Sequence, residues 1–425
     1  MQLELTTYID LQATVKPRRY LEFLKASQEN ALAAIKARLR AGRKIRLGIL
    51  CSGTPVWTGN DLVKLFLADS RFQAEVILIL QRFNYKDEDN GLVMLESYFK
   101  DSGLPYRKAT GSITAADYDI LIYTIPYWSM LPDFSSTDVP LTTFLCYIPY
   151  GFWHGICYDQ AFNLDFHNSL WKNFQFTSEY QELAAKHCEI GSHAMIYTGY
   201  PKLDPLFNGK LGKSTAWKIA RGQTVENVKR IIWAPHHSLY TGGNAHSTFA
   251  ENYEFMLLFA ASHPEYSFIY RPHPLVGLRA VSTGLFATLE DYGVYCQAWD
   301  NLPNACYAYG PYMADFVTSH ALITDCDSFL TEFLYVDKPC LYLMREGVEF
   351  NTWGKMCLEN YYQVAGDDFP GIMDFLAKTI DQDPKRPARE QFYKEHLDYY
   401  TETGRTAAEN VYHAIATEFD DIRPC

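Results

Sequence analysis

The stretch "IIWAPHH" (residues 231–237) is a short apolar run that ends in a proline and two histidines. A polar stretch, residues 207–230, separates it from an earlier series of similar apolar runs. Short apolar runs that alternate with helix-like patterns are typical of a buried parallel sheet with helices on both faces. The run at 231–237 therefore begins a second such array, and the sequence predicts two Rossmann-like domains in one chain.

The apolar runs that we expect to form strands lie on both sides of that polar stretch. In the first half they are residues 44–53, 74–80, 118–127, 141–151, 174–180 and 195–201. In the second half they are residues 231–237, 267–274, 293–299, 321–325 and 339–344. Ligands of such sheets bind outside the carboxyl ends of the strands. We therefore expect an α/β protein whose two parallel-sheet domains face a central cleft.

The change from one array to the next sets the expected domain boundaries. A chain of 425 residues exceeds what one hydrophobic core usually serves. The expected parts are an amino-terminal basic amphipathic helix at 1–43, a first Rossmann-like domain at 44–207, a linker at 208–228, a second Rossmann-like domain at 229–380 and carboxyl-terminal helices at 381–425.

The composition disfavours several classes of protein. The formal net charge of −12 at pH 7 argues against a broad nucleic-acid-binding surface. The 10 cysteines include no C-x-x-C pair and no Cys/His zinc spacing, so we expect reduced thiols, no disulfide scaffold and no metal. The G-x-G-x-x-G fingerprint and the Walker lysine loop are both missing, which disfavours a nicotinamide dehydrogenase and a P-loop enzyme. We expect no cofactor.

The segment at residues 16–46 is strongly basic and unlike the rest of the chain. Its apolar residues recur at near-helical spacing, which predicts an amphipathic helix over about 18–42. Such a helix lies on anionic lipid, or it packs on its own domain with a solvated basic face, and both alternatives stay open. We expect neither a secretory leader nor a membrane span. The expected location is cytoplasmic, at most peripheral on the inner face of the cell membrane.

Four polar clusters follow predicted strands, at the place where the cleft is expected. They are Trp153-His154-Gly155, Pro235-His236-His237-Ser238, Arg271-Pro272-His273-Pro274 and "TDCDSFLTEF" at 324–333. Neighbouring residues of a strand point to opposite faces, so the two adjacent histidines are not expected to bind one metal ion. The turn at 325–328 is a plain helix N-cap or an anion site. Because four clusters recur at one topological place, we expect them to form a functional cleft.

These clusters also carry a resemblance. "WHG", "TGYPKLD", "APHH", "RPHP" and "LITDCDSFLTEF" stand in the order and approximate spacing of the CDP-glycerol glycerophosphotransferase family. Enzymes of that family build teichoic-acid-like and capsular polymers on a GT-B fold. The resemblance runs from about residue 120 to 365 and includes "FNTWGKMCLENYY" at 350–362. The ordered set is specific, although no single motif is.

The resemblance implies a role for several residues. His154 corresponds to the base that accepts the proton of the attacking hydroxyl. Arg271 and His273 correspond to an R-x-H-P motif that neutralises the donor's pyrophosphate, and His273 is expected to be catalytic. Ser328 matches the second serine of a T-D-Y-S-S motif, and Glu332 matches an acidic residue that meets the ribose or the transferred group. The other residues expected at the nucleotide and phosphate site are His236, His237, Thr324, Asp325 and Asp327, and those expected on the acceptor side are Trp153 and Gly155.

The sequence departs from the family's pattern at several positions. Ile156 and Asp159 stand where the family commonly has Thr and Lys. Asp327 stands for the first serine of T-D-Y-S-S, and His236-His237 stands for the T-W of A-P-T-W. A carboxylate beside a phosphate is costly unless it faces elsewhere or meets a hydroxyl. These departures bear on the identity of donor and acceptor more than on the fold.

The expected function is a metal-independent transfer of a polyol phosphate, such as glycerol phosphate, from a CDP-linked donor to a hydroxyl of a surface glycan or polymer. Two alternatives stay open. One is a GT-B glycosyltransferase that uses a nucleotide sugar, because the same fold and phosphate site serve both reactions. The other is a non-catalytic GT-B scaffold in capsule assembly. The expected partners are the nucleotide-activated donor, the polymer acceptor and an anionic membrane surface, but no nucleic acid.

Overall fold

The chain folds into two units in a computed structural model. Unit 1 comprises Met1–Gly151, Cys157–Asp204 and Tyr399–Cys425, and unit 2 comprises Phe152–Ile156 and Pro205–Asp398. The structure describes residues 7–9, 12, 17–53, 57–79, 88–109, 111, 113–128, 131, 133–214, 216–240 and 245–422.

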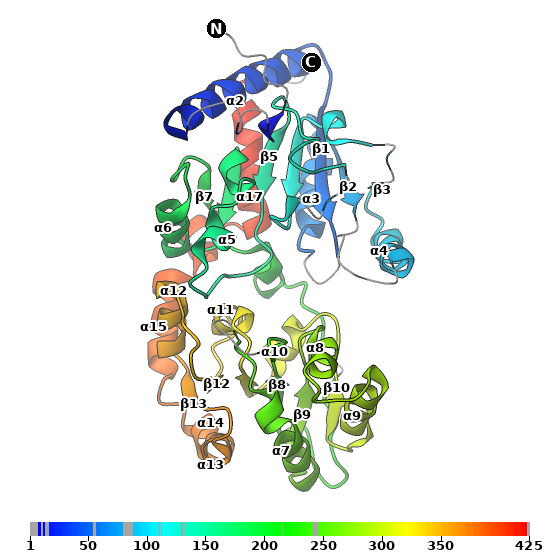
Figure 1. The fold of residues 1–425 in the computed structure, drawn as a ribbon, viewed down its shortest axis with the longest axis vertical. Helices are drawn as coiled ribbons and strands as arrows, with labels where there is room; N and C mark the ends of the chain where they lie inside the picture. The colour runs from blue at the N-terminus through cyan, green and yellow to red at the C-terminus, as the bar shows by residue number, and fades with distance from the viewer. Residues whose placement is uncertain are drawn as a thin grey trace. The chain divides into compact units, whose positions relative to one another are not determined.

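Unit 1 contains a parallel sheet of seven strands in the order β3-β2-β1-β4-β5-β6-β7 (Figure 1). The strands are β1 (Ile45–Cys51), β2 (Phe72–Leu78), β3 (Tyr106–Lys108), β4 (Ile120–Tyr123), β5 (Phe144–Tyr147), β6 (Lys172–Gln175) and β7 (Met195–Tyr197). Nearly every residue of β1, β4 and β5 is buried, as expected for strands that are covered on both faces. The order places the topological switch between β1 and β4.

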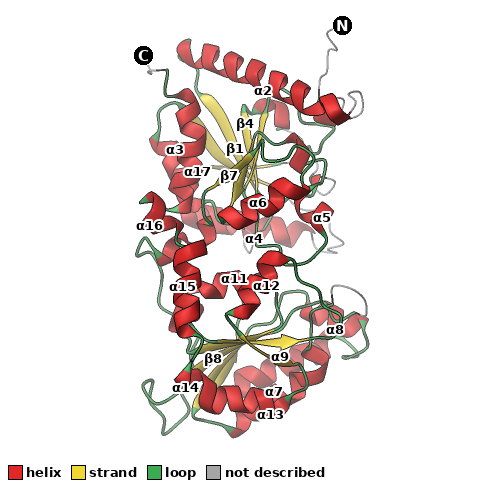
Figure 2. Ribbon diagram, turned by 90° about the vertical axis from the view of Figure 1, so that its left-hand side faces the viewer, coloured by secondary structure: helices red, strands yellow, loops and turns green. Residues whose placement is uncertain are grey.

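The helices of unit 1 pack on this sheet with their apolar sides. They are α2 (Pro17–Arg40), α3 (Asn60–Ala68), α4 (Glu88–Ser102), α5 (Tyr158–Phe162), α6 (Ser178–His187), α16 (Tyr399–Thr403) and α17 (Ala407–Ala416), with short helical turns at Ala115–Asp117, His167–Ser169, Pro201–Leu206 and Thr417–Phe419. Figure 2 shows α3 and α17 side by side on one face of the sheet. Val411 and Ile415 of α17 share one hydrophobic core with Phe66 of α3.

The basic amino-terminal helix packs on unit 1. Ala31, Ile35 and Leu39 of α2 are buried in the same core as β1 and β2. Arg38 forms an ion pair with the buried carboxylate of Asp119, which directly precedes β4. The helix extends over 17–40, close to the predicted 18–42. Its apolar side is therefore occupied by protein, and only its polar side faces solvent.

Unit 2 contains a second parallel sheet, of six strands in the order β10-β9-β8-β11-β12-β13. The strands are β8 (Lys229–Ala234), β9 (Tyr266–Tyr270), β10 (Ala305–Tyr307), β11 (Ala321–Thr324), β12 (Cys340–Met344) and β13 (Tyr362–Ala365). The register pairs Ala234 at the end of β8 with Thr324 at the end of β11. The segments that follow these two strands therefore emerge side by side at the topological switch.

The helices of unit 2 bury aromatic residues against this sheet. They are α7 (Phe249–Ser262), α8 (Val276–Ser282), α9 (Leu289–Asn301), α10 (Met313–Thr318), α11 (Ser328–Leu334), α12 (Thr352–Glu359), α13 (Phe369–Asp374), α14 (Ile380–Gln382) and α15 (Arg386–His396), with a wider helical turn at Phe375–Thr379. Trp233 of β8 stacks on Phe249 of α7 and on Tyr270 of β9. The hydrophobic core of unit 2 is thus built around β8, the first strand of the second sheet in chain order.

One predicted strand is wrong. Residues 293–299 lie inside helix α9, and the neighbouring strand is β10 at Ala305–Tyr307. The buried residues Tyr295, Cys296 and Trp299 are spaced as on one face of a helix, and the Thr288 side chain accepts a hydrogen bond from Asp291 N and caps its start. A short apolar run does not distinguish a buried helix from a strand, because both bury every apolar residue.

The division of the chain also differs from the expected boundaries. The Trp153-His154-Gly155 segment belongs to unit 2 rather than to the first domain. The expected linker packs on unit 2, where Ser214 donates to Asp315 and the Trp217 indole donates to Thr318. The last helices return to unit 1. Hydrophobic pattern predicts elements, but not which sheet each connecting segment covers.

The return of the chain to unit 1 is fixed by a buried carboxylate in "TGYPKLD". Asp204 accepts hydrogen bonds from Ala407 N at 2.7 Å and Ala408 N at 2.9 Å, at the start of α17. It also accepts from the Tyr399 hydroxyl at 2.9 Å. Gly199 has φ +81° and lies flat against the Tyr399 ring, where a Cβ would come within 2.5 Å. The motif therefore anchors the carboxyl-terminal helix.

Among the described residues, no helix combines the length and the apolar character that crossing a membrane requires.

Candidate functional site

His154 is held in unit 2 by the hydroxyl of Thr331. Its Nε2 lies 2.8 Å from Thr331 Oγ1, and the His154 side chain is completely buried. The Trp353 indole donates to the same oxygen at 2.9 Å, and Cys357 Sγ lies 3.4 Å from it. Nδ1 of His154 is buried and makes no hydrogen bond among the described residues. One nitrogen of the ring is thus fixed, and the other is left for a different partner.

The backbone around His154 is held by the start of α12. Asn351 N donates to the His154 carbonyl at 2.7 Å, and Asn351 Nδ2 donates to the Trp153 carbonyl at 2.8 Å. Asn351 Oδ1 accepts from Gly354 N at 2.8 Å and so also caps α12. A Cβ on Gly354 would lie 3.0 Å from the His154 carbonyl oxygen and 3.1 Å from His154 Cβ. The chain needs glycine here because the histidine loop rests on it.

His154 stays neutral in this environment. Burial lowers its pKa to about 4, and the nearby Asp327 carboxylate offsets only part of that effect. A neutral imidazole at neutral pH carries one bare nitrogen, which can accept a proton. The ring is therefore in the protonation state that a general base requires before it takes a proton.

Three imidazoles gather where β8 and β9 end. The rings of His236 and His237 have centroids 4.2 Å apart, and His273 stacks on His237 at 4.1 Å. His273 N donates to the Pro235 carbonyl at 3.0 Å, which joins the two loops. Burial lowers the pKa of His237 to about 4 and that of His273 to about 3, and it holds the pKa of His236 well below its ordinary value. These rings are neutral at pH 7.

Asp325 braces these loops. Its carboxylate accepts from His236 N, from Thr248 N and from the Thr248 hydroxyl at 2.9 Å. Burial raises the pKa of Asp325 to about 7 in spite of these donors. Thr324 donates to the Ala234 carbonyl at 2.6 Å. Both residues therefore connect the ends of β8 and β11 and face the protein.

Arg271 is also turned inward. Its guanidinium donates to Asp315 at 2.6 Å and to the Gly310 carbonyl at 2.9 Å, and only 6% of the residue is exposed. Glu332 is buried as well, and its carboxylate accepts from the Tyr312 hydroxyl. The Arg271 charge is compensated within unit 2, so this arginine fixes the segment at 310–315.

Arg345 is a cation that the sequence analysis did not consider. It follows β12, and its guanidinium donates to the carbonyls of Ser247 at 2.9 Å, Tyr240 at 3.2 Å and Ser238 at 3.3 Å. These partners are neutral, and no ion pair of Arg345 with a described residue compensates its positive charge. The signal in the sequence was an arginine directly after "PCLYLM", at the carboxyl end of a predicted strand.

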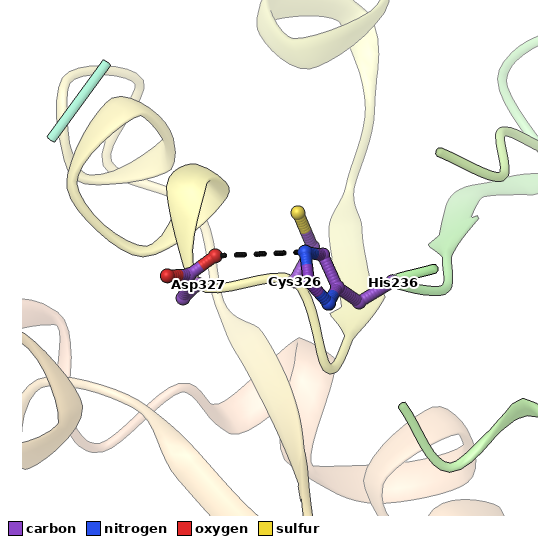
Figure 3. A group of neighbouring side chains, drawn as sticks. All are labelled: His236, Cys326 and Asp327. Atoms are coloured by element: carbon purple, nitrogen blue, oxygen red, sulfur yellow. Dashed lines mark ion pairs between the residues drawn. The ribbon is translucent and has the colours of Figure 1, made fainter. Parts of the chain in front are cut away.

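Asp327 and Ser328 stand at the start of α11. Burial would raise the pKa of Asp327, but the side chains of His246, His236 and His154 lower it below the ordinary value. Asp327 Oδ1 lies 3.9 Å from His236 Nε2. Figure 3 marks this contact with a dashed line. The carboxylate thus faces imidazoles.

The sequence of this chain matches the model of a known protein family. A model described as CDP-Glycerol:Poly(glycerophosphate) glycerophosphotransferase matches residues 163–417, more than half of the chain. The chain belongs to this family. Among curated proteins, no match was found.

Solved structures confirm the fold of this glycerophosphotransferase family member. The wall teichoic acid polymerase TagF is similar with a TM-score of 0.53 and 12% identity, over 96% of this chain and 99% of that one. MnaA of S. aureus, solved with UDP, gives a TM-score of 0.55 and 12% identity, over 89% and 99%. A UDP-N-acetylglucosamine 2-epimerase gives 0.53 and 13%, over 90% and 98%. The predicted family and the predicted architecture of two Rossmann-like domains are therefore confirmed.

The individual roles expected for site residues stay predictions. Unit 2 brings together the four predicted clusters, because His154 and His236 both act on the Asp327 carboxylate and His273 stacks on His237. Thr331, Asn351 and Gly354 were missed, although they stand inside quoted motifs. These three residues contact the His154 segment, which lies almost two hundred positions earlier in the chain, so the sequence alone did not indicate them.

Proposed function

We propose that this family member transfers glycerol phosphate from CDP-glycerol to a hydroxyl of a teichoic-acid-like polymer. Family membership supports the donor and the reaction class. The observation that carries the mechanism is the buried, neutral His154, whose Nε2 is fixed by Thr331 and whose Nδ1 has no hydrogen-bond partner among the described residues. A scaffold protein needs no such arrangement.

In the proposed reaction, the acceptor hydroxyl attacks the phosphorus next to glycerol. A new P–O bond forms to the acceptor, the pyrophosphate P–O bond breaks, and CMP leaves with the bond's electron pair. The hydroxyl proton passes to His154 Nδ1. A positioned base of this kind contributes about 10²–10⁴ in rate.

This role requires the tautomer of His154 with its proton on Nε2, and the contacts of Thr331 permit it. The Trp353 indole can only donate, so Thr331 Oγ1 accepts from it. If the Thr331 hydroxyl donates to Cys357 Sγ, its oxygen still has a lone pair for His154 Nε2–H. Nδ1 is then bare and ready to take a proton.

The donor phosphates need compensating charge. Arg345 is the proposed cation, because its partners are neutral carbonyls. The neutral rings of His237 and His273 add to it, since a bound pyrophosphate raises the pKa of a nearby imidazole. Arg271 is a positioning residue in this proposal, because Asp315 already neutralises it.

The test of donor and reaction is product analysis by mass spectrometry. The full chain is incubated with a polyol-phosphate polymer and separately with CDP-glycerol, CDP-ribitol and UDP-sugars. We expect mass increments of glycerol phosphate and release of CMP from CDP-glycerol alone, and activity that survives EDTA. Transfer of a sugar from a UDP donor would instead establish the glycosyltransferase alternative.

Two variants test the site assignments. His154→Ala should bind CDP-glycerol as wild type does and lose about 10²–10⁴ in turnover. Arg345→Ala should weaken CDP-glycerol binding in calorimetry without lowering the melting temperature, whereas Arg271→Ala should lower the melting temperature. Wild-type turnover in a folded His154→Ala protein would remove His154 from the mechanism.

We also propose that α2 brings the protein to anionic membrane surfaces by charge alone. The apolar side of the helix is packed in the core of unit 1, which leaves exposed cations such as Arg19 and Lys25 on the helix and Arg43 and Lys44 just after it. Binding to vesicles that contain anionic lipid should fall with salt and with replacement of these four residues by serine. Absence of binding at low salt would leave α2 a purely structural helix.

A further inference from the structure

Three potential metal ligands meet where β8 and β11 end. Figure 3 shows His236, Cys326 and Asp327 turned toward one another. One ligand atom of each residue lies within 4.8 Å of those of the other two. Cys326 is buried, and the His236 and Asp327 side chains are 12% and 20% exposed. The group is thus shielded from solvent but reachable from it.

The sheet topology brings these three residues together. β8 and β11 are adjacent parallel strands, so the loops at 235–238 and 325–328 leave the sheet together. Asp325 then ties the second loop to His236 N. His236 and His237 are neighbours in the sequence and were not expected to bind one metal ion, but the partners of His236 come from the segment that follows the neighbouring strand.

The remaining contacts of His236 suit a ligand. Its Nδ1 lies 2.8 Å from Ser238 Oγ, and that oxygen in turn accepts from His246 N at 2.8 Å. A hydrogen bond at one ring nitrogen is the usual way in which a metal-binding histidine is oriented, and it leaves Nε2 to face the ion. Here Nε2 is the atom that faces Asp327.

We propose that His236, Cys326 and Asp327 bind one Zn²⁺ ion. An imidazole, a thiolate and a carboxylate make up the kind of three-ligand set that zinc accepts with a fourth, open position. The thiol excludes Mg²⁺ and Ca²⁺, which require oxygen ligands. Tetrahedral zinc needs ligand atoms roughly 3.4–3.6 Å apart by its usual bond lengths. Rotation of the partly exposed Asp327 side chain can bring its carboxylate to this distance from the other two ligand atoms.

Calorimetry with Zn²⁺ on the reduced, EDTA-treated full chain tests the proposal. We expect one ion per chain. Cys326→Ala and Asp327→Asn should each lose at least about 100-fold in Zn²⁺ affinity, because loss of a residue that only orients a ligand costs up to about 100-fold. Cys157→Ser, a partly exposed cysteine in unit 1, and His237→Asn, the adjacent imidazole, are the matched controls and should bind as wild type does. Equal loss in a control, or no loss in the two ligand variants, would overturn the proposal.

A second measurement includes a readout on the wild-type chain, which does not depend on whether any variant folds. Co²⁺ added to the wild-type chain should give a thiolate-to-cobalt charge-transfer absorption and the visible spectrum of a tetrahedral ion. Cys326→Ser should abolish the charge-transfer band, and Cys157→Ser should keep it. Stoichiometric cobalt binding by wild type without that band would exclude Cys326 as a ligand, and so would sink the site.

Discussion

At the scale of single residues, burial and hydrogen bonding have different effects on His154. Burial keeps the ring neutral, with a pKa of about 4. Thr331 fixes its orientation through Nε2. The aromatic residues and glycines around His154 identified it from the sequence, whereas Thr331 stands within "SFLTEF" like any helical threonine. Its role exists only because α11 and the histidine loop belong to the same unit.

Thr331→Val tests that role. Valine has nearly the same shape but offers no oxygen, so the Trp353 indole and His154 Nε2 both lose their partner. We expect kcat to fall by about 10–100-fold, part of the value of a general base, with KM for CDP-glycerol unchanged. Leaving buried polar groups unpaired should also cost about 1–3 kcal/mol of stability.

Thr331→Ser is the matched control, because it keeps the hydroxyl. It should recover most of kcat, and the acid limb of the kcat/KM profile, expected near the His154 pKa of about 4, should shift in the valine variant only. A valine variant with wild-type kcat and an unshifted profile would show that Thr331 does not position the base.

At the scale of elements, α12 is the part that supports the histidine loop. Phe350 forms a β-bridge with Gly155, and its ring packs on His246, so the segment that leads into α12 contacts both halves of the candidate site. Sequence pattern predicted most strands, because buried parallel strands are continuously apolar. It failed at α9 for the same reason, and it could not identify α12 as the support of a distant loop.

Gly354→Ala tests this support. The added methyl group would meet the His154 carbonyl oxygen at 3.0 Å and His154 Cβ at 3.1 Å, which is closer than nearly all real contacts. The loop must move by a few tenths of an ångström. We expect turnover to fall by roughly 10-fold or more, because misplacement by about 1 Å costs about 10²-fold.

Gly293→Ala in α9 is the matched control. No atom lies within 4 Å of the Cβ that it would add. It should leave turnover unchanged and stabilise the protein by up to about 1 kcal/mol through helix propensity. Equal turnover in the two variants, both folded by circular dichroism, would contradict the proposed packing of α12 on the histidine loop.

At the scale of the whole molecule, the two sheets were predictable but the path of the chain was not. Two arrays of apolar runs with a polar interval predict two units, because each sheet needs its own core. Residues 152–156 nevertheless belong to unit 2, and residues 399–425 return to unit 1. These passages of the chain from one unit to the other depend on a few specific hydrogen bonds. Hydrophobic periodicity cannot predict such bonds.

Asp204 shows how one such bond responds to pH. It is the last residue of unit 1 before the chain leaves, and it binds Tyr399, where the chain returns. Burial raises the pKa of Asp204 to about 6, although its three donors oppose the shift. The folded protein therefore holds this proton more tightly than the unfolded chain, whose carboxyl has its ordinary pKa of about 3.9. Stability from this group is present below that ordinary value and is lost as pH rises through 6.

Asp204→Asn should remove this dependence, because asparagine resembles the protonated acid and does not titrate. The unfolding free energy of the variant relative to wild type should therefore rise by about 2 kcal/mol between pH 4 and pH 7, most of the roughly 3 kcal/mol that a shift of about two units is worth. Urea unfolding at several pH values measures the difference. Tyr399→Phe is the companion variant: it removes a donor that lowers the pKa, so wild-type-like dependence should extend to higher pH. A difference between Asp204→Asn and wild type that is flat, or that falls with pH, would mean that Asp204 is ionised in the folded protein throughout this range and anchors α17 as an anion.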